Sequence, residues 1–239
     1  MNERRTALVT GANKGIGFAI AAQLAARGFT VLVGARDATR RAAALSRLTG
    51  DVHGVELDVT DEPGVTQAAK EIRTRFGALD VLVNNAGITG DGTQVPGSGG
   101  LPEIRRVFDV NVFGVITVTE AMLPLLRPGA RVVNVSSSVG SLTDMTAPAG
   151  GSLADMPAML GYPVSKTALN AVTAQYAKHL RHQGILVNAI CPGYVATDLN
   201  GNDGPRTPDQ AATLAVHMAT LGPDGPTAAF VDDNGPITW

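Results

Sequence analysis

The sequence predicts a single α/β domain, in which helices cover both faces of a doubly wound parallel sheet of about seven strands. Short runs rich in Val, Ile and Leu alternate with Ala- and Leu-rich stretches, as in βαβ units. The strand-like runs are almost continuously apolar, which is typical of strands buried on both faces. A chain of 239 residues is long enough for one such domain with a large core, and no repeat or linker divides 1–239.

Seven strands are expected, in order, at residues 6–10, 30–35, 52–58, 79–84, 131–136, 185–190 and, more weakly, 229–232. Helical patterns lie between them at 15–27, 38–48, 62–76, 102–126, 162–181 and 208–221. Three loops interrupt this alternation, at 89–101, 141–160 and 198–207. Each follows the C-terminal end of a strand, where open α/β sheets bind ligands, so we expect these loops to shape a substrate site. The alternative is that they are tolerated surface insertions.

Composition and charge limit the classes of partner. With 19 Lys and Arg against 21 Asp and Glu, the net charge of −2 offers no basic surface for nucleic acid. A lone Cys191 cannot form an internal disulfide, which fits a reducing compartment. The N-terminus has no signal-peptide core, and no segment reads as long and apolar enough to span a bilayer. We therefore expect a cytoplasmic protein, away from membranes, whose partners are small molecules.

The first expected strand runs into the turn TGANKGIG at 10–17, and an Ala-rich helix follows. Glycines allow the backbone to approach a pyrophosphate, whose charge is favoured by the unpaired N–H groups and dipole of a helix start. The turn lacks the Gly-Lys-Ser/Thr of a P-loop, which disfavours kinase or ATPase chemistry. Taken alone, this turn is weak evidence, because a tight connection without a ligand has the same pattern.

Further motifs follow in order: NNAG at 84–87, Tyr162-x3-Lys166 and PGYVATDL at 192–199. Together with the first turn they resemble the short-chain dehydrogenase/reductase family, and within it the NADPH-dependent carbonyl reductases, over nearly the whole chain. The resemblance implies a Rossmann fold and a nicotinamide-dependent oxidoreductase that interconverts carbonyl and alcohol groups. It assigns cofactor binding to Gly11, Asn13, Lys14, Gly15, Ile16, Gly17, Arg36, Asp58, Val59, Asn85, Ala86, Gly87, Tyr162, Lys166, Pro192, Gly193, Val195 and Thr197.

The end of the second strand bears on the choice of cofactor. Ala35 stands where NAD users of the family usually carry an acid for the ribose hydroxyls, and Arg36 follows it. An arginine there would hold the 2′-phosphate of NADP(H), and Lys14 could add a second positive charge. Asp37 could instead be the ribose acid, but it also suits the N-cap of the next helix. The sequence thus favours NADP(H).

Tyr162 and Lys166 lie four residues apart on a predicted helix, about 40° around its axis, and so share one face. A phenol with a pKa of about 10 is a poor acid–base group at neutral pH. We expect Lys166, together with the positive ring of the oxidised cofactor, to lower that pKa. In the reductive direction Tyr162 would then donate a proton to the carbonyl oxygen.

The resemblance also assigns Ser137 to hydrogen-bond the substrate oxygen, and Asn111 to organise a water-linked proton relay to the lysine. Strand alternation turns Ser136 and Ser138 away from the direction that Ser137 faces. Cys191 is expected to be a small buried side chain. His179 and His182 could share a metal, but the sequence offers no third ligand, so no metal is expected.

Twenty-five positions separate Ser137 from Tyr162, more than is usual in the family. The added segment resembles insertions in carbonyl and menthone-type reductases that can be monomeric, so a monomer and a homodimer both remain open. Its three methionines, Met145, Met156 and Met159, could line an adaptable apolar pocket.

The rival functions are a non-catalytic NADP(H)-sensing module and a methyltransferase. A sensing module would normally lack the Tyr/Lys pair, which is intact here. A methyltransferase generally carries an acid at the end of the second strand, where this chain has Ala35. Substrate identity, stereochemistry and physiological direction are not readable from the sequence.

Overall fold

The computed structural model describes residues 4–147, 153 and 156–239. Its centre is an eight-stranded sheet in the order β3-β2-β1-β4-β5-β6-β7-β8, parallel except for the final pair. The strands are β1 (Thr6–Thr10), β2 (Thr30–Ala35), β3 (Val52–Glu56), β4 (Leu79–Asn84), β5 (Leu126–Val135), β6 (Leu186–Ile190), β7 (Phe230–Asp232) and β8 (Gly235–Pro236). The expected doubly wound α/β fold is confirmed.

Two strands depart from expectation. β8 is an added edge strand of two residues, too short to leave a pattern in the sequence. β5 begins at Leu126 rather than at 131, because Leu126 already pairs with Leu79 of β4 before the register shifts. The Pro128-Gly129 pair reads as a turn in the sequence, but here it lies within this irregular start.

The helices are α1 (Gly15–Ala26), α2 (Ala38–Leu45), α3 (Glu62–Phe76), α4 (Leu101–Phe108), α5 (Gly114–Met122), α6 (Leu142–Met145), α7 (Tyr162–Leu180) and α8 (Pro208–Ala219). The single helix expected at 102–126 is therefore wrong. A π-helical turn, Asp109–Phe113, separates α4 from α5, and the 3-10 turn Leu123–Leu125 ends the segment. Periodicity did not show this break, because the chain stays helical through a single π turn and changes only its hydrogen-bond spacing.

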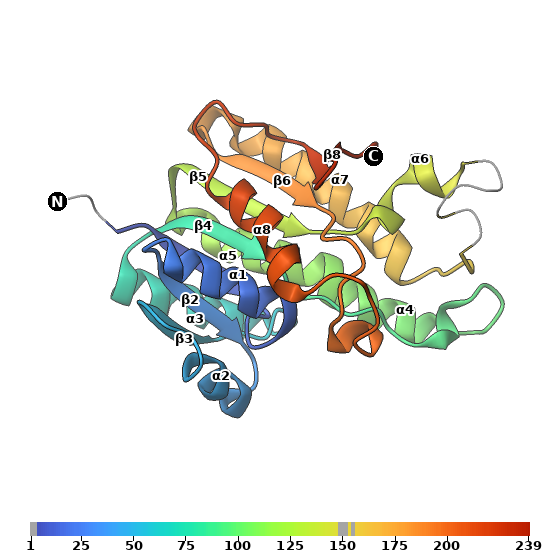
Figure 1. The fold of residues 1–239 in the computed structure, drawn as a ribbon, viewed down its shortest axis with the longest axis horizontal. Helices are drawn as coiled ribbons and strands as arrows, with labels where there is room; N and C mark the ends of the chain where they lie inside the picture. The colour runs from blue at the N-terminus through green and yellow to red at the C-terminus, as the bar shows by residue number, and fades with distance from the viewer. Residues whose placement is uncertain (1–3, 148–152, 154–155) are drawn as a thin grey trace.

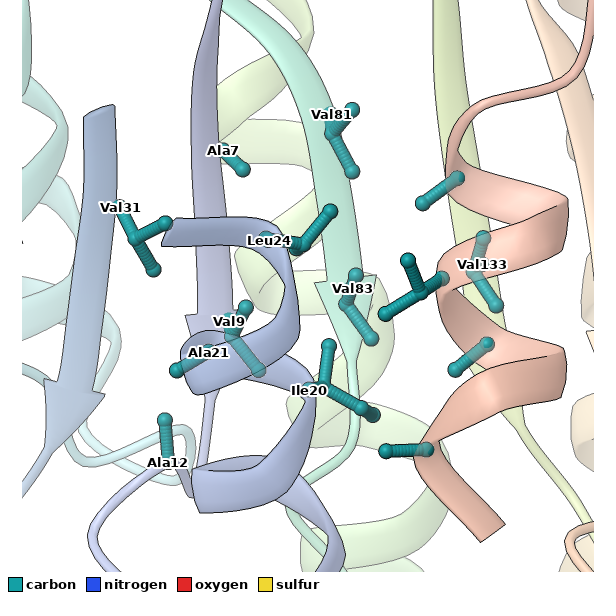
Figure 2. Close-up of a cluster of buried hydrophobic side chains, with 14 of the residues drawn as sticks. Ala7, Val9, Ala12, Ile20, Ala21, Leu24, Val31, Val81, Val83 and Val133 are labelled. Atoms are coloured by element: carbon teal, nitrogen blue, oxygen red, sulfur yellow. The ribbon is translucent and has the colours of Figure 1, made fainter. Parts of the chain in front are cut away.

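Two hydrophobic cores hold helices on opposite faces of the sheet (Figure 1). On one face α1 packs beside α8, and Ile20 and Leu24 of α1 contact the sheet near Val9 and Val83 (Figure 2). On the other face α3, α5 and α7 cover the same strands. Both faces being buried explains why the strand sequences are continuously apolar.

The segment Leu101–Leu125 is long and apolar enough, by length and composition, to cross a membrane. This corrects the expectation that the chain holds no such segment. Here 44% of its most apolar stretch is buried, and Val115, Val118 and Met122 of α5 belong to the core or are shielded from solvent. Packing on the sheet therefore accounts for its hydropathy.

The strand arrows in Figure 1 point toward one edge of the sheet, where α4, α6 and the chain leading into α8 project. The three expected loops follow β4, β5 and β6 and so lie at this edge. Most of 141–160 is described, including Met145, Met156 and Met159, whereas 148–152 and 154–155 lie outside the described residues.

Candidate active site

The turn between β1 and α1 has the conformation that a phosphate cradle needs. Gly11 and Gly15 adopt positive φ angles of 63° and 56°, where side chains are strained. A β-carbon on Gly17 would lie 2.4 Å from Asn85 Nδ2 and 2.6 Å from the Gly11 oxygen. The start of α1 at Lys14 has no side-chain cap and no acid in its first turn. Its N–H groups are therefore available to an anion, and the turn fits a pyrophosphate.

The end of β4 is tied to this turn. Asn85 Nδ2 donates to the Thr10 oxygen at 2.9 Å, and the main-chain N–H groups of Asn85 and Ala86 both donate to Thr10 Oγ1 at 3.0 Å. Ile16, predicted at this site, packs against the core at the start of α1. Asn85, which the resemblance assigns to cofactor binding, thus also supports the glycine-rich turn.

The end of β2 presents Arg36 to solvent, with 75% of its side chain exposed and its guanidinium 3.9 Å from an Asp58 oxygen. Asp58 accepts hydrogen bonds from the N–H and hydroxyl of Thr60. Val59 is nearly buried against Gly114, whose β-carbon would lie 2.7 Å from it. Asp37 accepts from the Arg40 N–H and caps α2, which favours the N-cap over the ribose acid.

A surface hollow of about 280 Å³ opens between α2 and the first turn. Its walls carry more positive than negative groups, and the lining residues are Asn13, Lys14, Arg40, Ala43, Ala44, Arg47 and Asp198. The sequence analysis missed Arg40 and Arg47. Arg40 lies in the first turn of α2 and lines the hollow together with Lys14; its place four residues after Arg36 in the sequence is the signal that could have pointed to it.

The segment after β6 meets the first turn from the other side. Gly193 adopts a φ of 77°, and Pro192 links it to the strand. Thr197 lies against Gly15, whose β-carbon would be 3.5 Å from the threonine methyl group. Val195 forms an isolated bridge to Arg206, which holds the segment beyond it. Of the predicted residues in this segment, Thr197 therefore lies against the glycine-rich turn.

Beyond Thr197, Lys14 Nζ lies 2.7 Å from an Asp198 carboxylate oxygen. The lysine lowers the pKa of Asp198 through this hydrogen bond. Lys14 therefore has an acidic partner in the chain itself, which an incoming phosphate would have to displace or share.

The first turn of α7 carries the candidate catalytic groups. Tyr162 is the first residue of the helix, and Lys166 follows one turn later on the same face, with Nζ 5.6 Å from the centre of the phenol ring. The Ser137 hydroxyl, two residues beyond the end of β5, faces the Tyr162 phenol and lowers its pKa as a hydrogen-bond partner. Lys166 Nζ donates to the Val135 oxygen at 2.9 Å. The sequence-predicted trio is thus brought together.

Burial sets the protonation of this pair. It raises the pKa of Tyr162 to about 12, while the Ser137 hydrogen bond acts in the lowering direction. Burial lowers the pKa of Lys166 to about 8. The chain alone therefore acts against the lowering of the tyrosine pKa expected from Lys166. It keeps the phenol protonated at neutral pH, which is the state of a proton donor.

Asn111 lies fully buried in the π-helical turn. Its amide oxygen accepts from the Ile88 N–H at 2.9 Å, and its nitrogen donates to the Ile88 oxygen and to Ser165 Oγ. A β-carbon on Gly87 would lie 3.3 Å from Asn111 Oδ1 and 3.6 Å from Lys166 Nζ. Asn111 is thus adjacent to the lysine across Gly87, and the water relay stays a prediction.

Ser136 and Cys191 lie as the sequence indicates. Ser136 is buried and donates to Asn170 Oδ1 at 2.6 Å, away from Tyr162. Cys191 is buried and accepts from the Ser138 N–H. His182 Nδ1 contacts the His179 oxygen, and no cluster of three or more candidate metal ligands occurs among the described residues.

A family model described as short chain dehydrogenase matches residues 5–207. The chain belongs to this family. Its members are oxidoreductases that act on carbonyl and alcohol groups with nicotinamide cofactors. As a short-chain dehydrogenase, the protein has the fold that its motifs indicate and is an oxidoreductase of carbonyl or alcohol groups.

Named short-chain dehydrogenases resemble it over their whole length. Salutaridine reductase from Papaver bracteatum is 33% identical, covering 97% of this chain and 95% of that protein. Carbonyl reductase [NADPH] 1 from Sus scrofa is 32% identical, covering 98% and 94%. A crystal structure of NADPH-bound carbonyl reductase from chicken fatty liver superposes with a TM-score of 0.86 at 28% identity, covering 99% of each chain.

Proposed function

We propose that this short-chain dehydrogenase is an NADPH-dependent reductase of ketones or aldehydes. The observation that carries the proposal is the meeting of three side chains at one edge of the sheet: Ser137 facing the phenol of Tyr162, with Lys166 one helical turn away. Two hydroxyl groups that face each other can both donate a hydrogen bond to a third oxygen, which in the reaction is the carbonyl oxygen of the substrate.

Each group has a defined part. Ser137 donates a hydrogen bond that orients and polarises the carbonyl, and Tyr162 Oη passes its proton to the oxygen. The bound reduced cofactor supplies the hydride that the carbonyl carbon receives. Lys166, held by the Val135 oxygen, stabilises the phenolate left behind. Asn111 fixes the start of the segment after Asn85-Ala86-Gly87 and serves the proton supply to Lys166.

The charges beside the first turn support NADP(H) over NAD(H). Ala35 stands where an acid would lie, Arg36 follows it at the end of β2, and the hollow between α2 and the first turn is lined by Lys14, Arg40 and Arg47. Guanidinium and ammonium groups bind a phosphate by charge-assisted hydrogen bonds. The names of the pig and chicken relatives specify NADPH for those proteins.

The exposed apolar side chains support a substrate of modest size with an apolar body. Large hydrophobic residues reach solvent from the three loops at the C-terminal edge of the sheet and from the segment just before the third loop, namely Val95, Leu101, Leu142, Met156, Leu160, Tyr194 and Leu199. Their clustering on the loops is typical of a ligand-binding surface. We place the enzyme in the cytoplasm, because its single cysteine, Cys191, cannot form an internal disulfide. We propose that it acts as a monomer or homodimer, without nucleic acid or membrane.

The test is turnover of NADPH with a panel of ketones and aldehydes, followed by the loss of nicotinamide absorbance. Tyr162→Phe should lower kcat by about 10²- to 10⁴-fold, because the general acid is lost. Tyr176→Phe is the matched control on the same helix, since its hydroxyl contacts only Glu120 among the contacts described. Near-normal turnover by Tyr162→Phe would contradict the mechanism. NADPH binding without turnover of any carbonyl would favour a sensing module.

A further inference from the structure

Gln94 is the one buried residue from 91 to 100, with 0% of its surface exposed in a loop otherwise open to solvent. Its amide nitrogen donates to the main-chain oxygens of Thr89 at 2.9 Å and Asp91 at 2.7 Å. Its amide oxygen accepts from the main-chain N–H of Tyr162 at 2.9 Å. The side chain therefore joins the loop after β4 to the first residue of α7.

The start of α7 depends on this contact. The first N–H groups of a helix have no partner within it. Gly161, at the N-cap, has no side chain to supply one, and Pro163 has no N–H to satisfy. Gln94 supplies the missing acceptor from another part of the chain, and its own main-chain oxygen accepts from the Leu160 N–H at 2.9 Å.

Two glycines make room for the amide. A β-carbon on Gly161 would lie 1.8 Å from Gln94 Oε1, and one on Gly90 would lie 2.4 Å from Nε2. Gly90 also has a φ of 75°, which disfavours a side chain. The backbone on both sides is thus shaped around the glutamine, so Gln94 is a built contact rather than a side chain that happens to fold inward.

We infer that Gln94 is a positioning residue for the proton donor. It holds the main chain of Tyr162 and thereby fixes where the phenol meets Ser137. This inference rests on the proposed function, because Gln94 itself touches neither Tyr162 Oη nor a reacting atom. A displacement of about 1 Å at a reacting group can cost about a hundredfold in rate, so a held backbone at Tyr162 has catalytic consequence.

Gln94→Met removes the amide and keeps its approximate length, and Gln67→Met makes the same change at an exposed site on α3. In Gln94→Met we expect kcat to fall roughly ten- to a hundredfold, with KM for NADPH unchanged. The solvent deuterium isotope effect on kcat should rise, because proton transfer becomes slower. Gln67→Met should match the wild type.

Gln94→Glu keeps the size of the side chain and makes its hydrogen bonding depend on pH. In its protonated form the acid still accepts from the Tyr162 N–H and donates to one main-chain oxygen, whereas its carboxylate faces the Thr89 and Asp91 oxygens without a donor. Its activity should therefore approach the wild type at low pH and fall toward Gln94→Met as pH rises. A merely structural role would not produce this pH-dependent rescue.

The main-chain contact has its own readout. The chain holds three tyrosines, so ¹⁵N-tyrosine labelling yields amide signals for Tyr162, Tyr176 and Tyr194 alone. We expect hydrogen exchange at Tyr162 to accelerate in Gln94→Met, while exchange at Tyr176 stays unchanged. Slow exchange at Tyr162 in Gln94→Met, or unchanged kcat and isotope effect in folded Gln94→Met, overturns the inference.

The failure of the proposed function looks different. A wild-type protein that reduces no carbonyl overturns the proposed function and with it the catalytic consequence of Gln94. The exchange measurement still decides, in that case, whether Gln94 holds the start of α7.

Discussion

Arg36 shows how one side chain at the end of a strand bears on cofactor choice. It extends into solvent with an Asp58 oxygen 3.9 Å away, a distance that allows attraction but no hydrogen bond. Its five donors are therefore free to bind a phosphate, and the neighbouring Ala35 offers no carboxylate to repel one.

Replacing Arg36 by Ala should weaken NADPH binding about ten- to a hundredfold, the value of one or two charge-assisted hydrogen bonds. NADH binding should change little, because NADH lacks the 2′-phosphate. Titration of both cofactors by fluorescence measures this, with Arg73→Ala on the exposed end of α3 as the control. Equal losses for NADPH and NADH would contradict the assignment of Arg36.

Helix α7 is the element that converts sequence spacing into chemistry. Its first turn places Tyr162 and Lys166 on one face, and its contacts with β6 seat that face against the sheet. Burial then moves the two pKa values apart, raising that of Tyr162 to about 12 and lowering that of Lys166 to about 8. The pair is thus a protonated phenol beside an ammonium that titrates near neutrality.

The reductive and oxidative reactions should respond oppositely to pH. Reduction needs a protonated phenol and a charged Lys166 to stabilise the phenolate that forms. We therefore expect kcat/KM to stay level at neutral pH and to decline above about pH 8, where Lys166 loses its charge. Oxidation of the alcohol needs the phenolate and should rise with pH. Lys166→Met should lack the decline near pH 8, and full pH profiles in both directions test this. A decline that persists in that variant would assign it to another group.

At the scale of the whole molecule, one sheet carries two cores, and the site lies at the edge where both end. Leu24 of α1 and Ile72 of α3 are fully buried on opposite faces. Because the same strands form the floor of both cores, loosening either face should weaken the entire fold.

Leu24→Ala and Ile72→Ala should each lower the free energy of unfolding by about 2–5 kcal/mol. Each should move a single urea transition, seen alike by far- and near-ultraviolet circular dichroism. Leu142→Ala, in an exposed position, should change the free energy by less than about 0.5 kcal/mol. A transition that splits into two in either core variant would contradict a single cooperative domain.

The sequence by itself determined the order of strands and helices, because burial on both faces makes each strand apolar and leaves helical periods between them. It also determined the phosphate turn, since Gly11 and Gly15 mark backbone that only glycine adopts with ease. The shared helix face of Tyr162 and Lys166 followed from their spacing, because four residues make about one turn of a helix, whereas their catalytic role came from the family resemblance.

Only the tertiary structure decided the contacts between segments distant in the chain. The π turn at Asp109–Phe113 leaves no mark in periodicity, and Gln94 lies in a loop whose composition indicates exposure. The pKa of Tyr162 also depends on burial by surrounding segments, which outweighs the local effect expected of Lys166. Spacing in the sequence determines which residues share a helix face. The folded chain determines which buried groups come into contact and how far each group is desolvated.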